Sequence, residues 1–279
     1  MLGRGMNLFS INSSIAVVLT LGCLPFSPAE TGLTGDLRET VLDISNGTLP
    51  RLRAVSNDET PQARLIRVMR GMSRPPISGR DFDDYEKELA DLAVGVGEVA
   101  DQALYLRARL FQVHRTPRDY EMAETLFLEL GARNPGSHWA QLGLVKVGLM
   151  RLYGARNPEA AEVRLNRAEA LLAMISEPAL RRDLHLQIGW AGLEWAQPLS
   201  AVIPHLKAAD QVGKLMGTVP EDLVLQIAEL SFRNGEISVA KIYFERFLQE
   251  FPTSIKRYNV EQRLADVARV AASTRGSGR

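Results

Sequence analysis

Four histidines are the residues of this chain whose chemistry is best suited to catalysis or metal binding. They are His114, His138, His185 and His205, and none stands at a metal-binding spacing such as HExxH. We expect His114 and His138 to be solvated near helix ends and His205 to be packed in a helical core. The histidines therefore predict no catalytic residue and no metal ligand.

An acidic run from Asp81 to Glu88 is the other candidate for a cation site. It lacks the glycine turn and the distant glutamate of a calcium loop. Ser78 or Asp81 instead suits the cap of a helix with an acidic first turn, because carboxylates are favourable at the positive end of a helix dipole. The sequence also contains no nucleophile elbow, P-loop or dinucleotide-binding glycine pattern. We therefore predict that the protein is not an enzyme and uses no cofactor.

Cys23 is the only cysteine, which excludes an intramolecular disulfide framework and a cysteine metal cluster. It stands near the end of an apolar run, Ile15 to Leu24, which follows the single charge of Arg4. That run is shorter than the roughly 20 residues that a transmembrane helix needs. The layout predicts a signal peptide over residues 1–29, cleaved either before Cys23 or after Ala29.

The residues Thr20-Leu21-Gly22-Cys23 resemble the lipobox of bacterial lipoproteins, in which the cysteine thiol carries diacylglycerol. The resemblance implies that Cys23 is the lipid attachment site, and Leu24 after it implies the outer membrane of a Gram-negative cell. The stretch Ser27-Pro28-Ala29 instead fits ordinary secretory cleavage into the periplasm. Cys23 is then only an apolar residue of the signal core. Lipoprotein and secreted protein both belong to the bacterial cell envelope.

The overall composition favours a globular protein without a charge bias. The chain has 279 residues, 46% of them hydrophobic, and its 33 Lys and Arg balance its 33 Asp and Glu. It is too apolar for a disordered chain, and the charge balance excludes a basic nucleic-acid binder. We therefore expect no nucleic-acid partner.

Helical periodicity begins near Thr60 and continues through most of the chain, which predicts an all-α fold. Three columns of residues recur at separations of 38, 40 and 39 positions, which indicates a repeated helix pair. Within each copy the columns lie four and seven residues apart, so they share one face of the second helix. The columns are Ala123, Ala161, Ala201 and Ala240; Phe127, Leu165, His205 and Phe244; and Leu130, Ala168, Ala208 and Phe247.

These residues resemble the tetratricopeptide repeat. Trp139-x-x-Leu142-Gly143 matches the signature of the family, and the copy from Ala228 to Pro252 has its alanine, glycine and aromatic spacing. The likeness covers about four repeats and implies an α-solenoid of antiparallel helix pairs. Carrying over the groove-facing positions of the family implies a protein-binding groove on two first helices. Those positions are Asp183, Trp190, Leu193, Glu194, Asp222, Glu229, Phe232 and Arg233.

The resulting organisation has five parts after the signal peptide. We expect a tether over residues 30–59, degenerate helices over 60–103, about four repeats over 104–252, a capping helix over 253–273 and a disordered tail over 274–279. In the capping helix, Ile255, Val260, Leu264, Val267 and Ala271 are expected on one face.

Two functions remain open on this evidence. One is a protein–protein interaction scaffold of the cell envelope, which binds another envelope protein through the concave surface and contacts the membrane through an N-terminal lipid if Cys23 is acylated. The alternative is a structural or assembly factor of an outer-membrane or cell-wall complex that acts by stacking. Trp190 and Phe232 are either anchors for the partner or fillers of helix interfaces.

Overall fold

The computed structural model describes residues 59–73, 77–154 and 159–276, with side chains described up to Ser273. Every regular element in those ranges is a helix, which confirms the all-α fold class. The chain divides into two units, Met1–Ile77 and Ser78–Arg279, and each is described by itself. Cys23, the expected signal peptide and nearly all of the expected tether lie outside the described residues.

The described part of the first unit contains one helix, α2 (Pro61–Met72), at the position that the sequence predicts. Thr60 caps it, because the Thr60 Oγ1 accepts a hydrogen bond of 3.3 Å from a first-turn backbone N–H. Leu65, Val68 and Met72 are buried, at the spacing of a single helical face.

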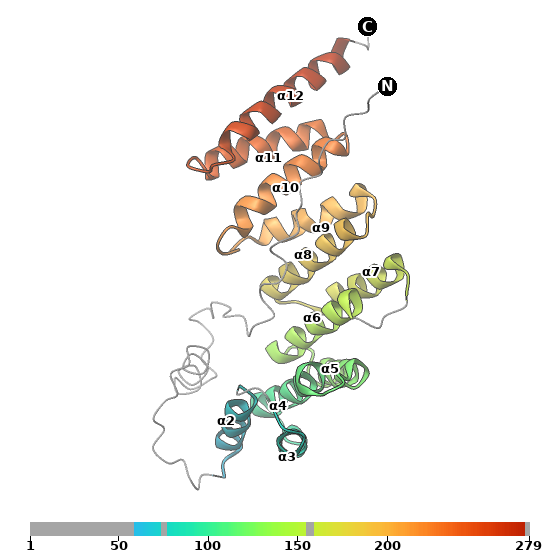
Figure 1. Cartoon of the computed structure of the whole chain (residues 1–279), viewed down its shortest axis with the longest axis vertical. Coiled ribbons are helices and arrows are strands. Elements are labelled where there is room, and N and C mark those ends of the chain that lie inside the picture. Colours follow the sequence, from blue (N-terminus) through green and yellow to red (C-terminus); the bar gives the residue numbers. More distant parts are fainter. Residues whose placement is uncertain (1–58, 74–76, 155–158, 277–279) are drawn as a thin grey trace. The chain divides into compact units, whose positions relative to one another are not determined.

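The second unit contains ten α-helices in its described residues, and each packs against the next in the chain (Figure 1). A π-helical segment, η1 (Leu110–His114), follows α4, and a 3-10 segment, η2 (Ala170–Met174), follows α7. The α-helices are α3 (Gly79–Ala93), α4 (Glu98–Arg109), α5 (Tyr120–Arg133), α6 (His138–Tyr153), α7 (Ala161–Glu169), α8 (Pro178–Glu194), α9 (Leu199–Val212), α10 (Val219–Arg233), α11 (Ile237–Glu250) and α12 (Arg257–Gly276).

The acidic run of the sequence forms part of α3 and is held by a helix cap. The Ser78 Oγ accepts a hydrogen bond of 3.1 Å from the backbone N–H of Asp81, so Ser78 is the N-cap residue. Asp81 stands in the first turn, where its negative charge interacts favourably with the positive end of the helix dipole. The helix ends at Ala93, and Gly97, at φ 92°, leads the chain into α4.

Many hydrogen bonds between helices of the second unit join residues 32 to 39 positions apart. Four of them join residues 36 positions apart: Glu177 to Gln141, His205 to Glu169, Trp190 to Gln226, and Arg246 to Asp210. Helices two apart in the chain are also in contact: α4 with α6, and α6 with α8. Recurrence at similar separations is typical of repeated helix pairs.

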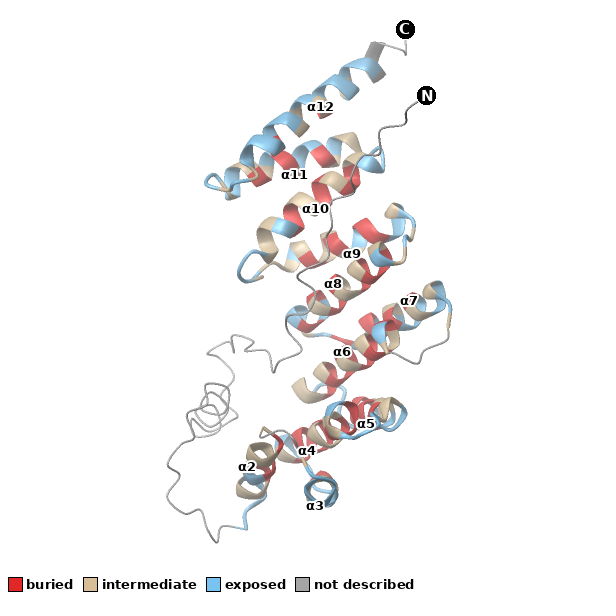
Figure 2. Ribbon diagram, in the orientation of Figure 1, coloured by how far each residue is buried: buried red, intermediate tan, exposed pale blue. Residues whose placement is uncertain are grey.

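Two glycines allow α8 to lie close against α9. A Cβ at Gly189 would lie 2.6 Å from Leu206 Cδ2, and a Cβ at Gly192 would lie 2.8 Å from Val202 Cγ2. Leu206 and Val202 belong to one buried cluster that α8, α9 and α10 share, whose residues are shown red in Figure 2. The absence of a side chain at Gly189 therefore sets the distance between these helices.

The second-helix columns are buried in the copies formed by α5 and α11, as the repeat pattern predicts. In α7, Leu165 and Ala168 are buried and Ala161 is half-buried. The register of the α9 copy is wrong by one residue, because Ala201 is exposed while the buried residues are Val202, Leu206 and Ala209. The repeat pattern placed Ala201 on the buried face. In the structure the larger side chains of Val202 and Leu206 lie there instead, against Gly192 and Gly189.

The last helix, α12, covers an apolar cluster on α10 and α11. Val260 and Val267 are buried in that cluster together with Phe244 and Phe247. Ile255 does not share this face, because it precedes the helix and is 95% exposed. The helix also continues to Gly276, beyond the residue where the sequence predicts its end.

Candidate functional site

The predicted groove residues of α8 divide between a helix interface and the surface. Trp190 packs against the cluster shared by α8, α9 and α10, and its Nε1 donates a hydrogen bond of 3.2 Å to Oε1 of Gln226. Leu193 packs against the same cluster, whereas Glu194 is exposed. The indole of Trp190 therefore serves first to join α8 to α10.

Three of the four predicted groove residues of α10 contact α12 or the residue just before it. Lys256 forms an ion pair with Asp222. Arg263 binds Glu229, and its guanidinium carbon lies 5.4 Å from the centre of the Phe232 ring. The polar or aromatic groups of Asp222, Glu229 and Phe232 therefore already contact Lys256 or Arg263, and a partner-binding groove at these residues stays a prediction. Of the predicted set on α10, Arg233 is exposed and makes no ion pair within the described residues.

Three charged residues form a row at equal spacing on the helices α4, α6 and α8, each the first helix of an expected pair. Arg109 of α4, Lys146 of α6 and Asp183 of α8 stand 37 residues apart along the chain. Burial lowers the pKa of Lys146 to about 8, with a smaller contribution from the charge of Arg109, while the charge of Asp183 opposes the shift. Burial also raises the pKa of Asp183, against the effect of Arg182 and Lys146. These charges therefore interact with one another across the helices.

The residues at either end of this row are held in place. The Arg109 Nη1 donates a hydrogen bond of 2.5 Å to Oε1 of Gln112, in the π-helical segment. At the other end, buried Arg182 binds the Asp183 carboxylate and donates to the backbone carbonyl groups of Gly213 and Lys214 at 2.9 and 3.1 Å. Lys146, between them, makes no hydrogen bond within the described part of the chain and is half-buried.

Sequence reasoning selected Asp183 but not Arg109 or Lys146. The signal that could have found them was their common separation of 37 residues, close to the repeat period. The resemblance to the tetratricopeptide repeat did not point to Arg109 or Lys146, because it gave groove residues only on α8 and α10.

Two histidines, His138 and His205, have environments that differ from those expected. His138 begins α6, and its Nδ1 lies 2.9 Å from Oε2 of Glu177, so it is paired rather than merely solvated. His205 is not in the buried column of α9. Its side chain is 15% exposed, and its Nδ1 lies 3.0 Å from Nδ1 of His185.

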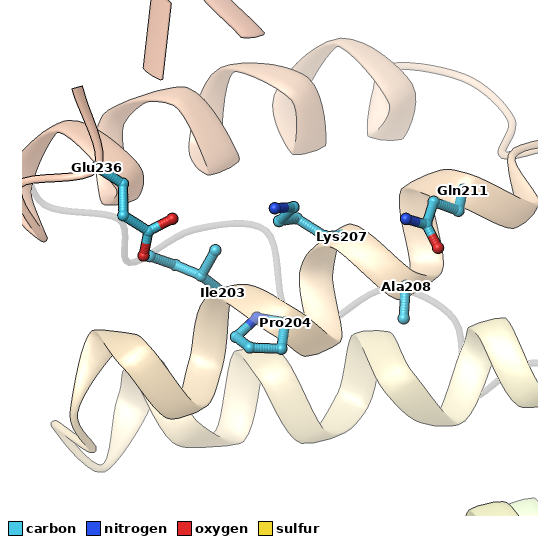
Figure 3. Close-up of a pocket in the computed structure, with 6 residues that line it drawn as sticks. All are labelled: Ile203, Pro204, Lys207, Ala208, Gln211 and Glu236. Carbon is cyan, nitrogen blue, oxygen red and sulfur yellow. The ribbon is translucent and has the colours of Figure 1, made fainter. Parts of the chain in front are cut away.

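A shallow pocket of about 250 Å³ lies between α9 and the start of α11 (Figure 3). Lys207 and Glu236 place opposite charges at its walls, and Pro204 forms part of its floor. The described residues contain no group of three or more His, Cys, Asp or Glu side chains able to hold a metal ion. The pocket is lined mainly by apolar atoms, with Lys207, Gln211 and Glu236 as its polar side chains.

No family model matches the chain, and no curated protein or solved structure is significantly similar to it. Among the described helices, none is both long enough and apolar enough to cross a membrane.

Proposed function

We propose that the second unit is an α-solenoid of helix pairs, similar to tetratricopeptide repeats, and that it binds a partner protein of the bacterial cell envelope. The observation that carries the proposal is the row of Arg109, Lys146 and Asp183, at equal spacing on three successive first helices. Charges repeated on the same helix of each pair form an extended surface, which suits a peptide or a helix better than a small substrate.

The working surface in this proposal lies on α4, α6 and α8 rather than on α10. Glu229 and Phe232 contact Arg263 of α12, and Asp222 pairs with Lys256 just before that helix, so these three residues already have partners within the chain. Glu194, at the end of α8, is exposed and extends the charged row. The partner would be recognised by positive groups on α4 and α6 and by negative groups on α8.

Two features support the solenoid and the scaffold function over assembly by stacking. Hydrogen bonds between residues 32 to 39 positions apart, four of them at 36, support a succession of helix pairs. The exposed side of α12 carries the polar residues Glu261, Gln262 and Arg269 beside exposed Tyr258 and Val270, and these polar residues disfavour stacking at that end. Stacking by other surfaces is an outcome that size-exclusion chromatography would detect.

Capture of the partner from native envelopes after mild crosslinking tests the proposed surface. The double variant Lys146→Gln with Glu194→Gln should reduce capture by about tenfold, as expected when central contacts are removed. Lys241→Gln with Glu245→Gln provides the matched control, because these residues form an exposed ion pair on α11. Circular dichroism should be unchanged in both variants, and equal capture by both would refute the assignment of the surface.

We also propose that the chain reaches the envelope through its N-terminal segment, either as a lipoprotein acylated at Cys23 or as a secreted protein. The lipobox resemblance supports the first alternative. Cys23→Ser should release the protein from the membrane fraction into the soluble fraction. An unchanged distribution would exclude lipid attachment and leave secretion.

A further inference from the structure

Two histidines face one another beside a carboxylate, at a place that the proposed binding surface does not use. His185 of α8 and His205 of α9 hold their Nδ1 atoms 3.0 Å apart, with ring centres separated by 5.2 Å. On the other side of the His205 ring, Nε2 lies 3.1 Å from Oε1 of Glu169, at the end of α7. The cluster thus draws one residue from each of three helices.

The carboxylate determines which nitrogen of His205 carries the proton. Glu169, when ionised, can only accept a hydrogen bond, so Nε2 of His205 is the donor. In the neutral ring the lone pair is then on Nδ1, which faces His185. The space between the rings can therefore hold either a proton on His185 or a cation that both nitrogens bind.

We propose that His185 and His205 bind a divalent first-row transition-metal ion through their Nδ1 atoms. Imidazole nitrogen binds zinc at about 2.0–2.1 Å. Two nitrogens in adjacent octahedral or square-planar positions at such a distance are about 3.0 Å apart, as they are here. Tetrahedral binding requires only a slight widening, to about 3.4 Å.

The position of Glu169 supports this assignment independently of the distance between the histidines. Metal-binding histidines commonly donate their second ring N–H to a carboxylate, which orients the ring and raises its basicity. Glu169 has that relation to His205. Its carboxylate is 42% exposed and the His205 side chain is 15% exposed, so the site is open to water on one side.

Metal binding at this site uses the Nδ1 lone pair of each histidine. His185 would then carry its N–H on Nε2, and His205 would donate its N–H to Glu169. A hydrated ion would exchange two water molecules for the two Nδ1 atoms and keep water in its remaining positions, because no third protein ligand stands in the described residues.

Calorimetric titration of the full chain, without a histidine tag, with Zn²⁺ and with Cu²⁺ tests the site. We expect one ion per chain, and electron paramagnetic resonance of the Cu²⁺ form should show two coordinated nitrogens. His185→Gln and His205→Gln should each abolish this binding. Glu169→Gln should weaken it by about 10- to 100-fold, as loss of an orienting carboxylate does.

His138→Gln is the matched control, because His138 also pairs with a glutamate but has no second histidine facing it in the described residues. This variant should bind as the unaltered chain does. Absence of binding by the unaltered chain, or retention of binding by both His185→Gln and His205→Gln, would overturn the proposal. If His205→Gln fails to fold, as circular dichroism would show, the His185→Gln variant still decides the question.

Discussion

Arg263 and Glu229 form a two-point ion pair between α12 and α10. The Arg263 Nε donates to Oε1 at 2.8 Å and Nη2 donates to Oε2 at 2.6 Å. Parallel hydrogen bonds of this kind are geometrically specific, and here they fix the last helix over the ring of Phe232.

Replacing Arg263 should therefore loosen α12. We expect Arg263→Ala to lower the free energy of unfolding by about 1 kcal/mol, a modest value because both side chains are partly exposed. Chemical denaturation measures the change. Arg269→Ala is the control, since Arg269 is 79% exposed and pairs within α12, and equal losses in the two variants would contradict the importance of the α10–α12 ion pair.

Gly189→Ala should destabilise the contact between α8 and α9. The added methyl group would lie 2.6 Å from Leu206 Cδ2, so the helices must separate or Leu206 must leave its position. We expect a loss of about 1–3 kcal/mol in thermal or chemical unfolding. Gly136→Ala, whose Cβ meets no atom within 4 Å, should be neutral or slightly stabilising, and a similar loss at both sites would refute the packing argument.

Gln141 acts as a side-chain cap for α8. Its buried Oε1 accepts hydrogen bonds from the backbone N–H groups of Ser176 and Glu177 at 2.8 and 2.7 Å. Gln141→Leu would leave both donors unsatisfied, and we expect a loss of about 2–3 kcal/mol. Gln211→Leu, at an exposed position, should change stability by less than about 0.5 kcal/mol in the same denaturation experiment.

Lys146 should make stability depend on pH in the alkaline range. Its folded-state pKa of about 8 lies below the ordinary value of 10.5, mainly because burial disfavours the charged amine. The folded chain therefore binds fewer protons than the unfolded chain between these values, and this contribution to stability rises as pH rises from 8 to 10.5.

Lys146→Met should remove that dependence and raise stability at pH 7 by about 1 kcal/mol, after allowance for the partial exposure of the side chain. The advantage of the variant should shrink as pH approaches 10.5. Lys241→Met, at an exposed site on α11, should have little effect at either pH. A destabilising Lys146→Met variant would show that the charged amine is favourable in the fold.

The sequence predicted the helical class and most of the helix-forming segments because apolar spacing and helix caps are local properties. Ser78 and Val260 illustrate this, since the first caps α3 and the second lies on the buried face of α12. The register of α9 could not be obtained in this way. Ala201 and Val202 both suit a helix, and only the close approach of Gly189 to Leu206 decides which face is buried.

The candidate surface was predicted less well, because its residues are selected by neighbouring helices. Glu229 occupies a groove position of the repeat pattern, but Arg263 reaches it from α12, 34 residues later in the chain. Lys146 shows the opposite case. Its burial between charged neighbours is a property of three packed helices, and its local sequence is that of an ordinary amphipathic helix.

Helix α12 has one apolar face and one face that includes charged residues, so it could close the end of other helix pairs as it does here. Val260 and Val267 close the apolar face of the helix pair before it, while Glu261 and Arg269 turn outward. A pair of helices inserted after Glu250 would find an apolar neighbour on one side and the same closing helix on the other. In the proposed solenoid, the number of helix pairs could then be changed by engineering while the same closing helix is kept.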